Sequence, residues 1–204
     1  MSLPIAPVKR ESGDDRKLAI ALAARDLIVE KGLEGLRTRD IAQRVGINIA
    51  TLHYHVPSKE ALIELVTATM VGEFRVQSLN RPRAHLSPAE RLEHEFFDFH
   101  EMFTQHRDVL AVMSELMERA RRDETIRAII QPVQAKWRDM VAAIFEAGVD
   151  DGSFRADLDP EVAALVQIGA LIAFCRGLDT SPAYFDRLCA ELRRAVANPL
   201  PPKD

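Results

Sequence analysis

Helix-start signals are spread along the whole chain, and they limit the fold more than any other feature of the sequence. A short polar residue that can accept a hydrogen bond stands directly before a proline at Ser87-Pro88, Asp159-Pro160 and Ser181-Pro182. Such a residue satisfies free amides at the start of a helix, and proline at the first helical position has no amide to satisfy. Apolar residues recur at spacings of three and four, and strand-like alternation over several residues is missing. The sequence therefore predicts an all-α fold.

We expect nine helices between two tails, residues 1–13 and 199–204. Glycine or proline ends several of the helices, as at Gly32, Gly46 and Pro57. The expected helices cover about residues 14–31, 39–45, 49–55, 59–79, 88–105, 107–121, 125–150, 160–178 and 182–197.

The composition excludes several classes of protein. Of the 204 residues, 47% are hydrophobic and 28% charged, which is enough to bury a core. No apolar run approaches the ~20 residues that a membrane-spanning helix needs, and the first ten residues do not have the order of a signal peptide. The two cysteines, Cys175 and Cys189, cannot form a disulfide framework or a four-ligand zinc site by themselves. We therefore expect a cytoplasmic protein with no cofactor and no membrane partner.

The net charge of −4 hides an asymmetry. Residues 1–60 hold ten basic and eight acidic side chains, whereas residues 61–204 hold 17 and 23. The basic groups concentrate between Arg37 and Lys59, where Asp40 is the one acidic residue. An acidic protein with one compact basic segment suits an anionic partner that meets it in one place, although such a segment also occurs as an ordinary solvated surface.

Residues 37–56 have the pattern of two short helices joined by a tight turn. Gly46 stands where the chain must take a left-handed conformation, which costs glycine nothing. The small side chain of Ala42 lets the two helices cross closely, and we expect Thr38 and Asn48 to cap them. This pattern is typical of a helix-turn-helix, which lays its second helix in the DNA major groove. The alternative is a pair of ordinary core helices.

The polar surface of the second helix favours DNA binding over that alternative. Amide, hydroxyl and imidazole groups gather there, on Asn48, Thr51, His53, Tyr54 and His55. Arg39, Arg44 and Lys59 flank them with basic groups. Such side chains make the contacts to phosphates and base edges in protein–DNA complexes.

Residues 16–66 resemble the N-terminal domain of the tetracycline-repressor (TetR) family of transcriptional regulators. The matching residues are Ala23-Ala24, Leu27-Ile28, Glu30-Lys31-Gly32, Thr38, Ile41-Ala42, Val45-Gly46-Ile47, Thr51-Leu52, His55-Val56, Ser58-Lys59-Glu60 and Leu62. The rest of the chain is similar to the family only in architecture. The resemblance implies a DNA-binding domain over 14–74, with the helix-turn-helix at 37–56, and an effector-binding and dimerisation domain over 75–198.

The resemblance also implies the roles of individual residues at a DNA operator. It implies phosphate contacts from Thr38, Thr51, Tyr54 and Lys59. It implies groove or base-edge contacts from Arg39, Asn48, Ile49 and Ala50. His53 stands where the family usually has tyrosine, and its imidazole can still donate to a phosphate. Ile49 stands where members often carry a polar residue, so it either touches a thymine methyl or packs against neighbouring helices.

The family's fifth to eighth helices enclose a cavity for a small molecule. The candidates for a cavity wall here are Phe96, His100, Phe103, Met113, Met117, Trp137 and Phe174. Methionine and aromatic side chains adapt to varied apolar ligands, and the alternative is that they are ordinary core residues.

The last two expected helices suit an interface between two copies of the chain. The helix over 160–178 is apolar nearly all round, and the helix over 182–197 is amphipathic. The candidate interface residues are Leu165, Ile168, Leu171, Ile172, Tyr184, Leu188 and Leu192. We expect a homodimer, since the family pattern and a palindromic operator both require one, and the alternative is an intramolecular core.

The sequence thus predicts a ligand-responsive repressor that a small apolar or amphipathic effector releases from a palindromic operator. The alternative is a DNA-binding regulator without an effector, controlled by a protein partner. An enzyme is not expected. His94, His100 and His106 are spaced by six residues, which scatters them around a helix, and no nucleophile motif is present. We therefore expect no catalytic residue and no metal site.

Overall fold

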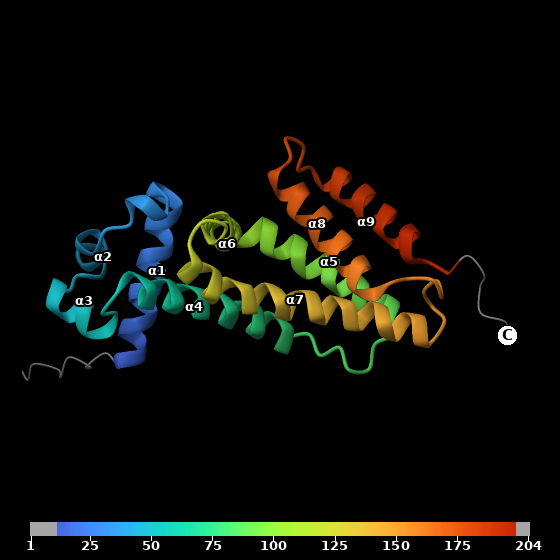
Figure 1. The fold of residues 1–204 in the computed structure, drawn as a ribbon, viewed down its shortest axis with the longest axis horizontal. Helices are drawn as coiled ribbons and strands as arrows, with labels where there is room; N and C mark the ends of the chain where they lie inside the picture. Colours follow the sequence, from blue (N-terminus) through green and yellow to red (C-terminus); the bar gives the residue numbers. More distant parts are fainter. Residues whose placement is uncertain (1–11, 199–204) are drawn as a thin grey trace, which may run out of the picture. The chain divides into compact units, whose positions relative to one another are not determined.

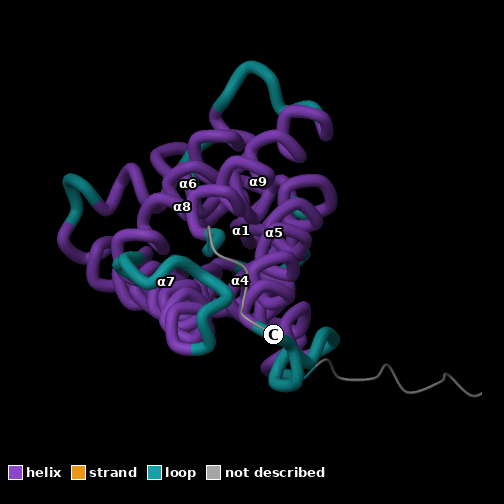
Figure 2. The backbone as a smooth tube through the Cα atoms, turned by 90° about the vertical axis from the view of Figure 1, so that its right-hand side faces the viewer, coloured by secondary structure: helices purple, strands orange, loops and turns teal. Residues whose placement is uncertain are grey.

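The structure is a computed structural model that describes residues 12–198 of the chain. Within this range the chain forms nine α-helices, one short 3-10 helix and no strand beyond a single bridge between Phe154 and Ala197. Figure 2 shows helices and loops throughout the described part. The prediction of an all-α fold with nine helices is confirmed. The expected tails lie outside the described residues, except that Ser12 and Gly13 already belong to the first helix and its cap.

The helices begin and end within two residues of their expected bounds (Figure 1). They are α1 Gly13–Lys31, α2 Thr38–Val45, α3 Ile49–His55, α4 Lys59–Leu79, α5 Pro88–Gln105, α6 Arg107–Ala120, α7 Glu124–Asp150, α8 Pro160–Arg176 and α9 Pro182–Val196. The 3-10 turn η1, Leu33–Gly35, lies between α1 and α2.

Short polar side chains cap the starts of α5, α8 and α9 as expected. Ser87, Asp159 and Ser181 each accept a hydrogen bond from a backbone amide in the first turn that follows. The expected cap at Thr38 is wrong. Thr38 is itself the first helical residue of α2, and the extended residue before it is Arg37, whose side chain caps nothing. The start of α2 therefore has no side-chain cap.

The chain packs as two compact units that do not follow the order of the sequence. Among the described residues, the head unit comprises 12–72 and 111–129, and the body unit comprises 73–110 and 130–198. Helices α4, α6 and α7 each run from one unit into the other. The end of α6 and the start of α7 thus pack with the head, although the sequence suggests that they belong to the C-terminal domain.

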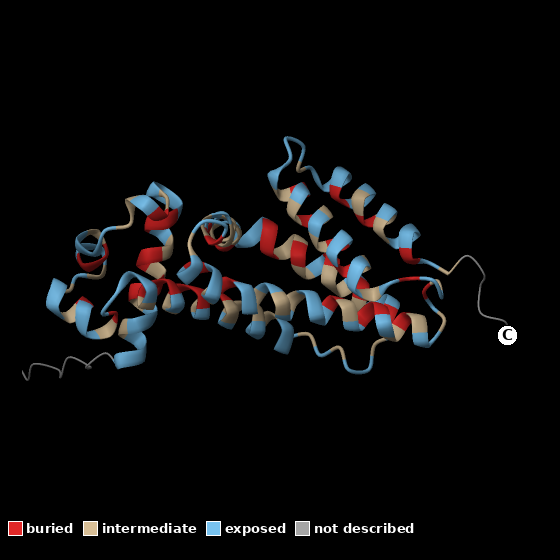
Figure 3. Ribbon diagram, viewed as in Figure 1, coloured by how far each residue is buried: buried red, intermediate tan, exposed pale blue. Residues whose placement is uncertain are grey.

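The core of the body unit is built from aromatic and aliphatic faces of α5, α7, α8 and α9. Buried positions follow one side of each of these helices in Figure 3. Phe145 of α7 is fully buried, and its ring centre lies 5.8 Å from that of Phe154. Phe154 packs directly over Gly148, where a Cβ atom would meet the ring at 2.0 Å. Glycine is required at 148 because no larger residue leaves room for Phe154.

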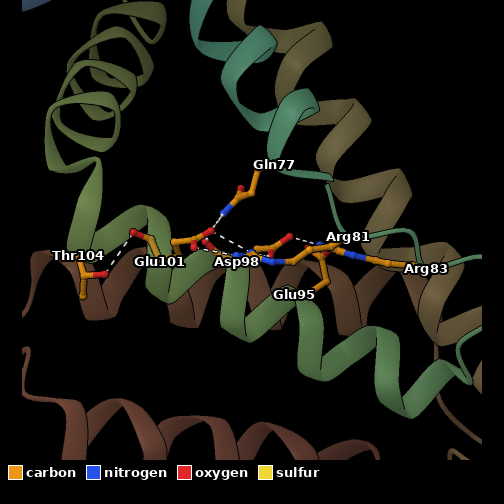
Figure 4. A network of polar contacts seen from close by, with 7 residues as sticks. All are labelled: Gln77, Arg81, Arg83, Glu95, Asp98, Glu101 and Thr104. Atoms are coloured by element: carbon orange, nitrogen blue, oxygen red, sulfur yellow. Dashed lines mark hydrogen bonds and ion pairs between the residues drawn. The ribbon is translucent and has the colours of Figure 1, made fainter. Parts of the chain in front are cut away.

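A polar network ties the end of α4 and the following loop to α5 (Figure 4). The guanidinium of Arg81 lies 2.5 Å from the Asp98 carboxylate and 2.7 Å from that of Glu101. Gln77 donates to Glu101 at 2.7 Å, and Arg83 pairs with Glu95 and Asp98. These side chains are largely shielded from solvent, so the network holds the connection between α4 and α5 in one arrangement.

Candidate nucleic-acid interface

Ion pairs connect α1 to α2, the first helix of the expected helix-turn-helix. Arg44 donates to both carboxylate oxygens of Glu30, with N–O distances of 2.8 Å. Lys31 donates to Asp40 at 2.7 Å. Hydrogen bonds from Arg44 and from Lys31 hold the pKa values of Glu30 and Asp40, respectively, below their ordinary values. Arg44 therefore turns towards α1, whereas we expected it from the sequence to flank α3 as a basic group for an external anion.

The turn between α2 and α3 has the expected geometry. Gly46 ends α2 in the left-handed conformation, with φ 74° and ψ 32°. The Ile47 amide then donates to the carbonyl of Ala42 at 2.9 Å, which closes the helix end. A Cβ atom at Gly46 would meet nothing within 4 Å, so conformation and not space favours glycine here. Ala42 and Leu52 are buried between the helices.

Asn48 caps α3. Its Oδ1 atom accepts a hydrogen bond from the Thr51 amide at 2.7 Å, as the sequence predicts. The short helix ends at His55, and the next residue, Val56, is buried. The cap and this anchor hold the seven-residue helix at both ends, which a helix of this length needs because it is not stable by itself.

Most of the ten predicted DNA-contact residues lie on the surface. The exposed ones are Thr38, Arg39, Asn48, Ile49, Ala50, His53, Tyr54 and Lys59, while Thr51 and His55 are half-buried. Tyr54 is 84% exposed, so most of its ring is open to solvent. The structure leaves Ile49 exposed at the first turn of α3, open to a groove contact. The contacts themselves stay predictions.

An open hollow of about 510 Å³ lies between the start of α1 and α3. Its lining combines Ser12, Gly13, Arg16, Gly46, Ile47, Asn48, Thr51 and His55. Arg16 is the one arginine of this lining, and we did not expect it there from the sequence. The signal for it is weak, because a basic residue in the first turn of a helix is common and only the fold brings it beside Thr51 and His55.

Five of the seven predicted cavity residues meet around the core of the body unit. Phe96, Phe103 and Phe174 are buried in that core, and Trp137 packs against it. The Phe103 and Phe174 rings meet edge to face at 5.2 Å, and the His100 ring lies 4.8 Å from that of Phe185. The other two, Met113 and Met117, lie on the part of α6 that belongs to the head unit.

Two further aromatic residues join this set without having been expected. Phe99 stacks on Trp137 with ring centres 6.4 Å apart, and on its other side it stacks on Phe185 at the same distance. The apolar spacing along α5 and α9 predicts that Phe99 and Phe185 are core residues, and both are buried in the core. Only the fold reveals that they connect Trp137 to His100 through a continuous row of rings.

The predicted interface residues divide into exposed and buried ones. Leu165 of α8 is 62% exposed and Tyr184 of α9 is exposed too, while Ile168, Ile172, Leu188 and Leu192 are half-buried. Leu171 is only 1% exposed, because its side chain packs in the core of its own chain. It therefore has no surface with which to contact a second copy. Val162 and Val166 on the same helix are exposed too. The sequence does not single out these two valines, because the helix is apolar nearly all round.

Other kinds of site find little support in residues 12–198. No group of three or more histidine, cysteine or acidic side chains in that range could hold a metal ion. None of the helices there combines the length and apolarity that crossing a bilayer requires. Burial raises the pKa of Cys175 and of Cys189 to about 11, which suppresses the reactive thiolate form of both residues.

Two family models match the chain. Residues 20–66 match the model of bacterial regulatory proteins of the tetR family, and residues 89–192 match that of a tetracyclin repressor-like C-terminal domain. The chain belongs to the TetR family. This TetR-family chain is a DNA-binding transcriptional regulator, and the prediction of a regulator in place of an enzyme is confirmed.

Known relatives agree with the assignment to the TetR family. The HTH-type transcriptional repressor KstR2 of Rhodococcus jostii (strain RHA1) is 25% identical over 148 residues, which are 72% of each chain. A TetR-family regulator from Agrobacterium tumefaciens has the same fold, with a TM-score of 0.77 and 19% identity over 91% of this chain and 100% of that one. The ketosteroid transcriptional regulator KstR2 of Mycobacterium tuberculosis gives a TM-score of 0.69 and 20% identity, over 89% and 95% of the two chains.

Proposed function

We propose that this TetR-family regulator is a homodimeric repressor that leaves a palindromic operator when a small apolar or amphipathic effector binds. The observation that carries the proposal is the surface of α3. Its polar and aromatic side chains are exposed or half-buried, Asn48 caps its start, and Leu52 is buried on its inner side. A rigid short helix with such a surface suits insertion into the major groove of chromosomal DNA in the cytoplasm.

The predicted DNA-contact residues divide into two roles at the operator. Lys59 at the start of α4, together with Thr38, Thr51 and Tyr54, contacts phosphates. These contacts fix the position of the protein without reading sequence. Arg39, Asn48, Ile49 and Ala50 reach the base edges, with His53 and His55 beside them. An exposed Ile49 meets a thymine methyl, the apolar feature that the major groove offers.

The exposed apolar face of α8 supports the homodimer. Val162, Leu165 and Val166 lie along it, and Tyr184 of the neighbouring helix α9 is exposed too. The two helices lie side by side at the red end of the chain in Figure 1. A second copy related by a two-fold axis covers this face with its own α8 and α9, and gives the two heads the symmetry of a palindrome.

The row of aromatic rings in the body unit supports an apolar or amphipathic effector. The row consists of the apolar rings of Trp137, Phe99 and Phe185, and His100 at its end adds a polar tip. The regulator from M. tuberculosis with the same fold is described as a ketosteroid regulator, and a ketosteroid is an apolar molecule with polar ends. We propose this chemical class, and not one compound, for the effector of this chain.

The test combines DNA selection with fluorescence. Fragments of genomic DNA that the protein retains give the operator, and the neighbouring genes suggest candidate effectors. Trp137 is the only tryptophan, so its emission reports on the aromatic row. An effector should change this emission and weaken operator binding over the same concentration range. Operator DNA should weaken effector binding by the same factor, because coupling between two sites is reciprocal.

An effector that bound beside Trp137 and left operator affinity unchanged would contradict the proposed control. The alternative is a regulator that is controlled by a protein partner, and in that case no small molecule should weaken operator binding. A partner protein would then lower operator affinity in the absence of any change in Trp137 emission.

A further inference from the structure

A carboxylate on α6 reaches the connection that leads into the helix-turn-helix. Oε1 of Glu115 accepts a hydrogen bond from the Leu33 amide at 3.2 Å, across 82 residues of sequence. Both residues lie in the head unit. The same carboxylate oxygen lies 3.6 Å from the place where a Cβ atom on Gly32 would stand, so it sits against the end of α1.

The amide of Leu33 depends on this contact because of how α1 ends. Gly32 takes a positive φ of 68° and donates its own amide back to Ile28, which closes the helix one residue before Leu33. The chain then turns through η1 towards Thr38, the first residue of α2. Leu33 itself is 2% exposed. Glu115 thus supplies an acceptor at the point where the backbone leaves α1. The path of the backbone from this point sets the direction of α2.

A second contact between the same segments is weaker. Arg119, one turn further along α6, pairs with Glu34 of η1. Its side chain is 41% exposed and that of Glu34 is 72% exposed. Exposed ion pairs contribute little because solvent and salt screen them. The half-buried bond from Leu33 to Glu115 is therefore the contact that orients the connection.

We infer that Glu115 is a positioning residue for operator recognition, acting on α2 and α3 through the Leu33 amide. Glu115 lies outside the helix-turn-helix, and its hydrogen bond ties Leu33, at the start of the connection to α2, to α6. Without that tie the connection gains freedom, and the recognition helix no longer meets the groove in one orientation. The basic side chains remain in place, so attraction to DNA of any sequence persists. The inference rests on the proposed operator binding.

Two conservative variants separate the hydrogen bond from the charge. Glu115→Gln keeps an acceptor oxygen at the same reach and removes the charge, whereas Glu115→Asp keeps the charge and withdraws it by one methylene. Glu118, an exposed glutamate three residues further along α6, offers a matched control with the same two substitutions. None of these surface changes leaves a cavity in a core.

The experiment measures two quantities. The first is amide hydrogen exchange at Leu33 in the full chain without DNA. The second is affinity for a DNA fragment selected by the wild type, relative to a random-sequence duplex of equal length. Glu115→Asp should speed Leu33 exchange several-fold and weaken binding to the selected fragment by roughly tenfold, ~1.4 kcal/mol. Its affinity for the random duplex should stay within about twofold of the wild type. Glu115→Gln and both Glu118 variants should match the wild type.

Two results would overturn the inference. Faster Leu33 exchange in Glu115→Asp with full preference for the selected fragment would leave the bond a local feature without a part in recognition. Unchanged Leu33 exchange in Glu115→Asp would show that the hydrogen bond to Glu115 does not protect this amide. A wild-type protein that prefers no fragment over random DNA would instead overturn the proposed function, and that failure is visible before any variant is made.

Discussion

Arg44 donates from its guanidinium to both carboxylate oxygens of Glu30, with two N–O distances of 2.8 Å, whereas Lys59 at the start of α4 is exposed. Arg44→Ala should therefore leave the salt dependence of operator binding unchanged. Lys59→Ala should lower the slope of log affinity against log salt by about one unit, because one phosphate contact is lost. Binding titrations at several salt concentrations measure both slopes. Equal losses in the two variants would mean that Arg44 leaves Glu30 to contact a phosphate.

Asn48 has two separable tasks, capping α3 and meeting the operator. Asn48→Asp keeps an acceptor for the Thr51 amide, so thermal stability should stay near that of the wild type. Its new negative charge should repel DNA and weaken operator binding at least tenfold. Asn48→Ala loses the cap and should destabilise the protein by about 1 kcal/mol. Thermal melts together with DNA titrations test this pair, and a stable Asn48→Asp variant that still binds normally would remove Asn48 from the interface.

Leu165 and Leu171 lie on the same helix and should respond in opposite ways to a charge. Leu165→Glu places a carboxylate on the exposed face of α8, so the proposed dimer should dissociate into folded monomers at micromolar concentration. Leu171→Glu forces a charge into the core of the chain, which costs several kcal/mol and should prevent folding. Light scattering and circular dichroism distinguish the outcomes. A dimeric Leu165→Glu protein would place the interface elsewhere.

Acid should weaken the body unit through the network at the end of α4. The hydrogen bond from Arg81, followed by that from Gln77, holds the pKa of Glu101 below its ordinary value. A group with a lowered folded pKa stabilises the protein above its unfolded pKa of about 4.3, and this contribution disappears as the pH falls through the folded pKa. Urea unfolding from pH 7 to pH 3 should therefore show a steeper loss of stability in the wild type than in Glu101→Gln. Parallel curves would contradict the network.

Both thiols should react slowly in the native protein. Burial raises the pKa of Cys175 and Cys189 to about 11, so roughly a thousandth of each thiol is ionised at pH 8. Modification with a thiol reagent at pH 8 should be at least a hundredfold slower than in denaturant. Cys175→Ser isolates the reaction of Cys189. Rapid native reaction of either residue would show that α8 or α9 opens readily.

Local signals explain what could be predicted from the sequence. Ser87, Asp159 and Ser181 announce the helix starts because a cap and a following proline lie within two adjacent residues. Gly46 and Asn48 likewise mark the turn and the start of α3 within a few positions. Thr38 misleads for the same reason, because nothing in its neighbours reveals that Arg37 and not Thr38 takes the extended conformation.

Contacts between distant residues could not be predicted. The partner of Arg44 lies 14 residues away and depends on how α1 crosses α2. Leu171 and Leu165 are equally apolar in sequence, and only packing against α9 and α5 decides which of them is buried. The exposure of the polar residues on α3, by contrast, could largely be predicted, because polar residues on a short amphipathic helix seldom lie inside.

Residues 111–129 pack with the head, although the C-terminal family model covers them. A chimera that joins this DNA-binding domain to another regulator's sensory domain at residue 74 would therefore replace part of the head's own packing. Such exchanges should succeed more often when Glu115 and its surroundings stay with the head. The two domains of this chain are thus not separable units of exchange, since residues 111–129 belong to the C-terminal domain by sequence and to the head by packing.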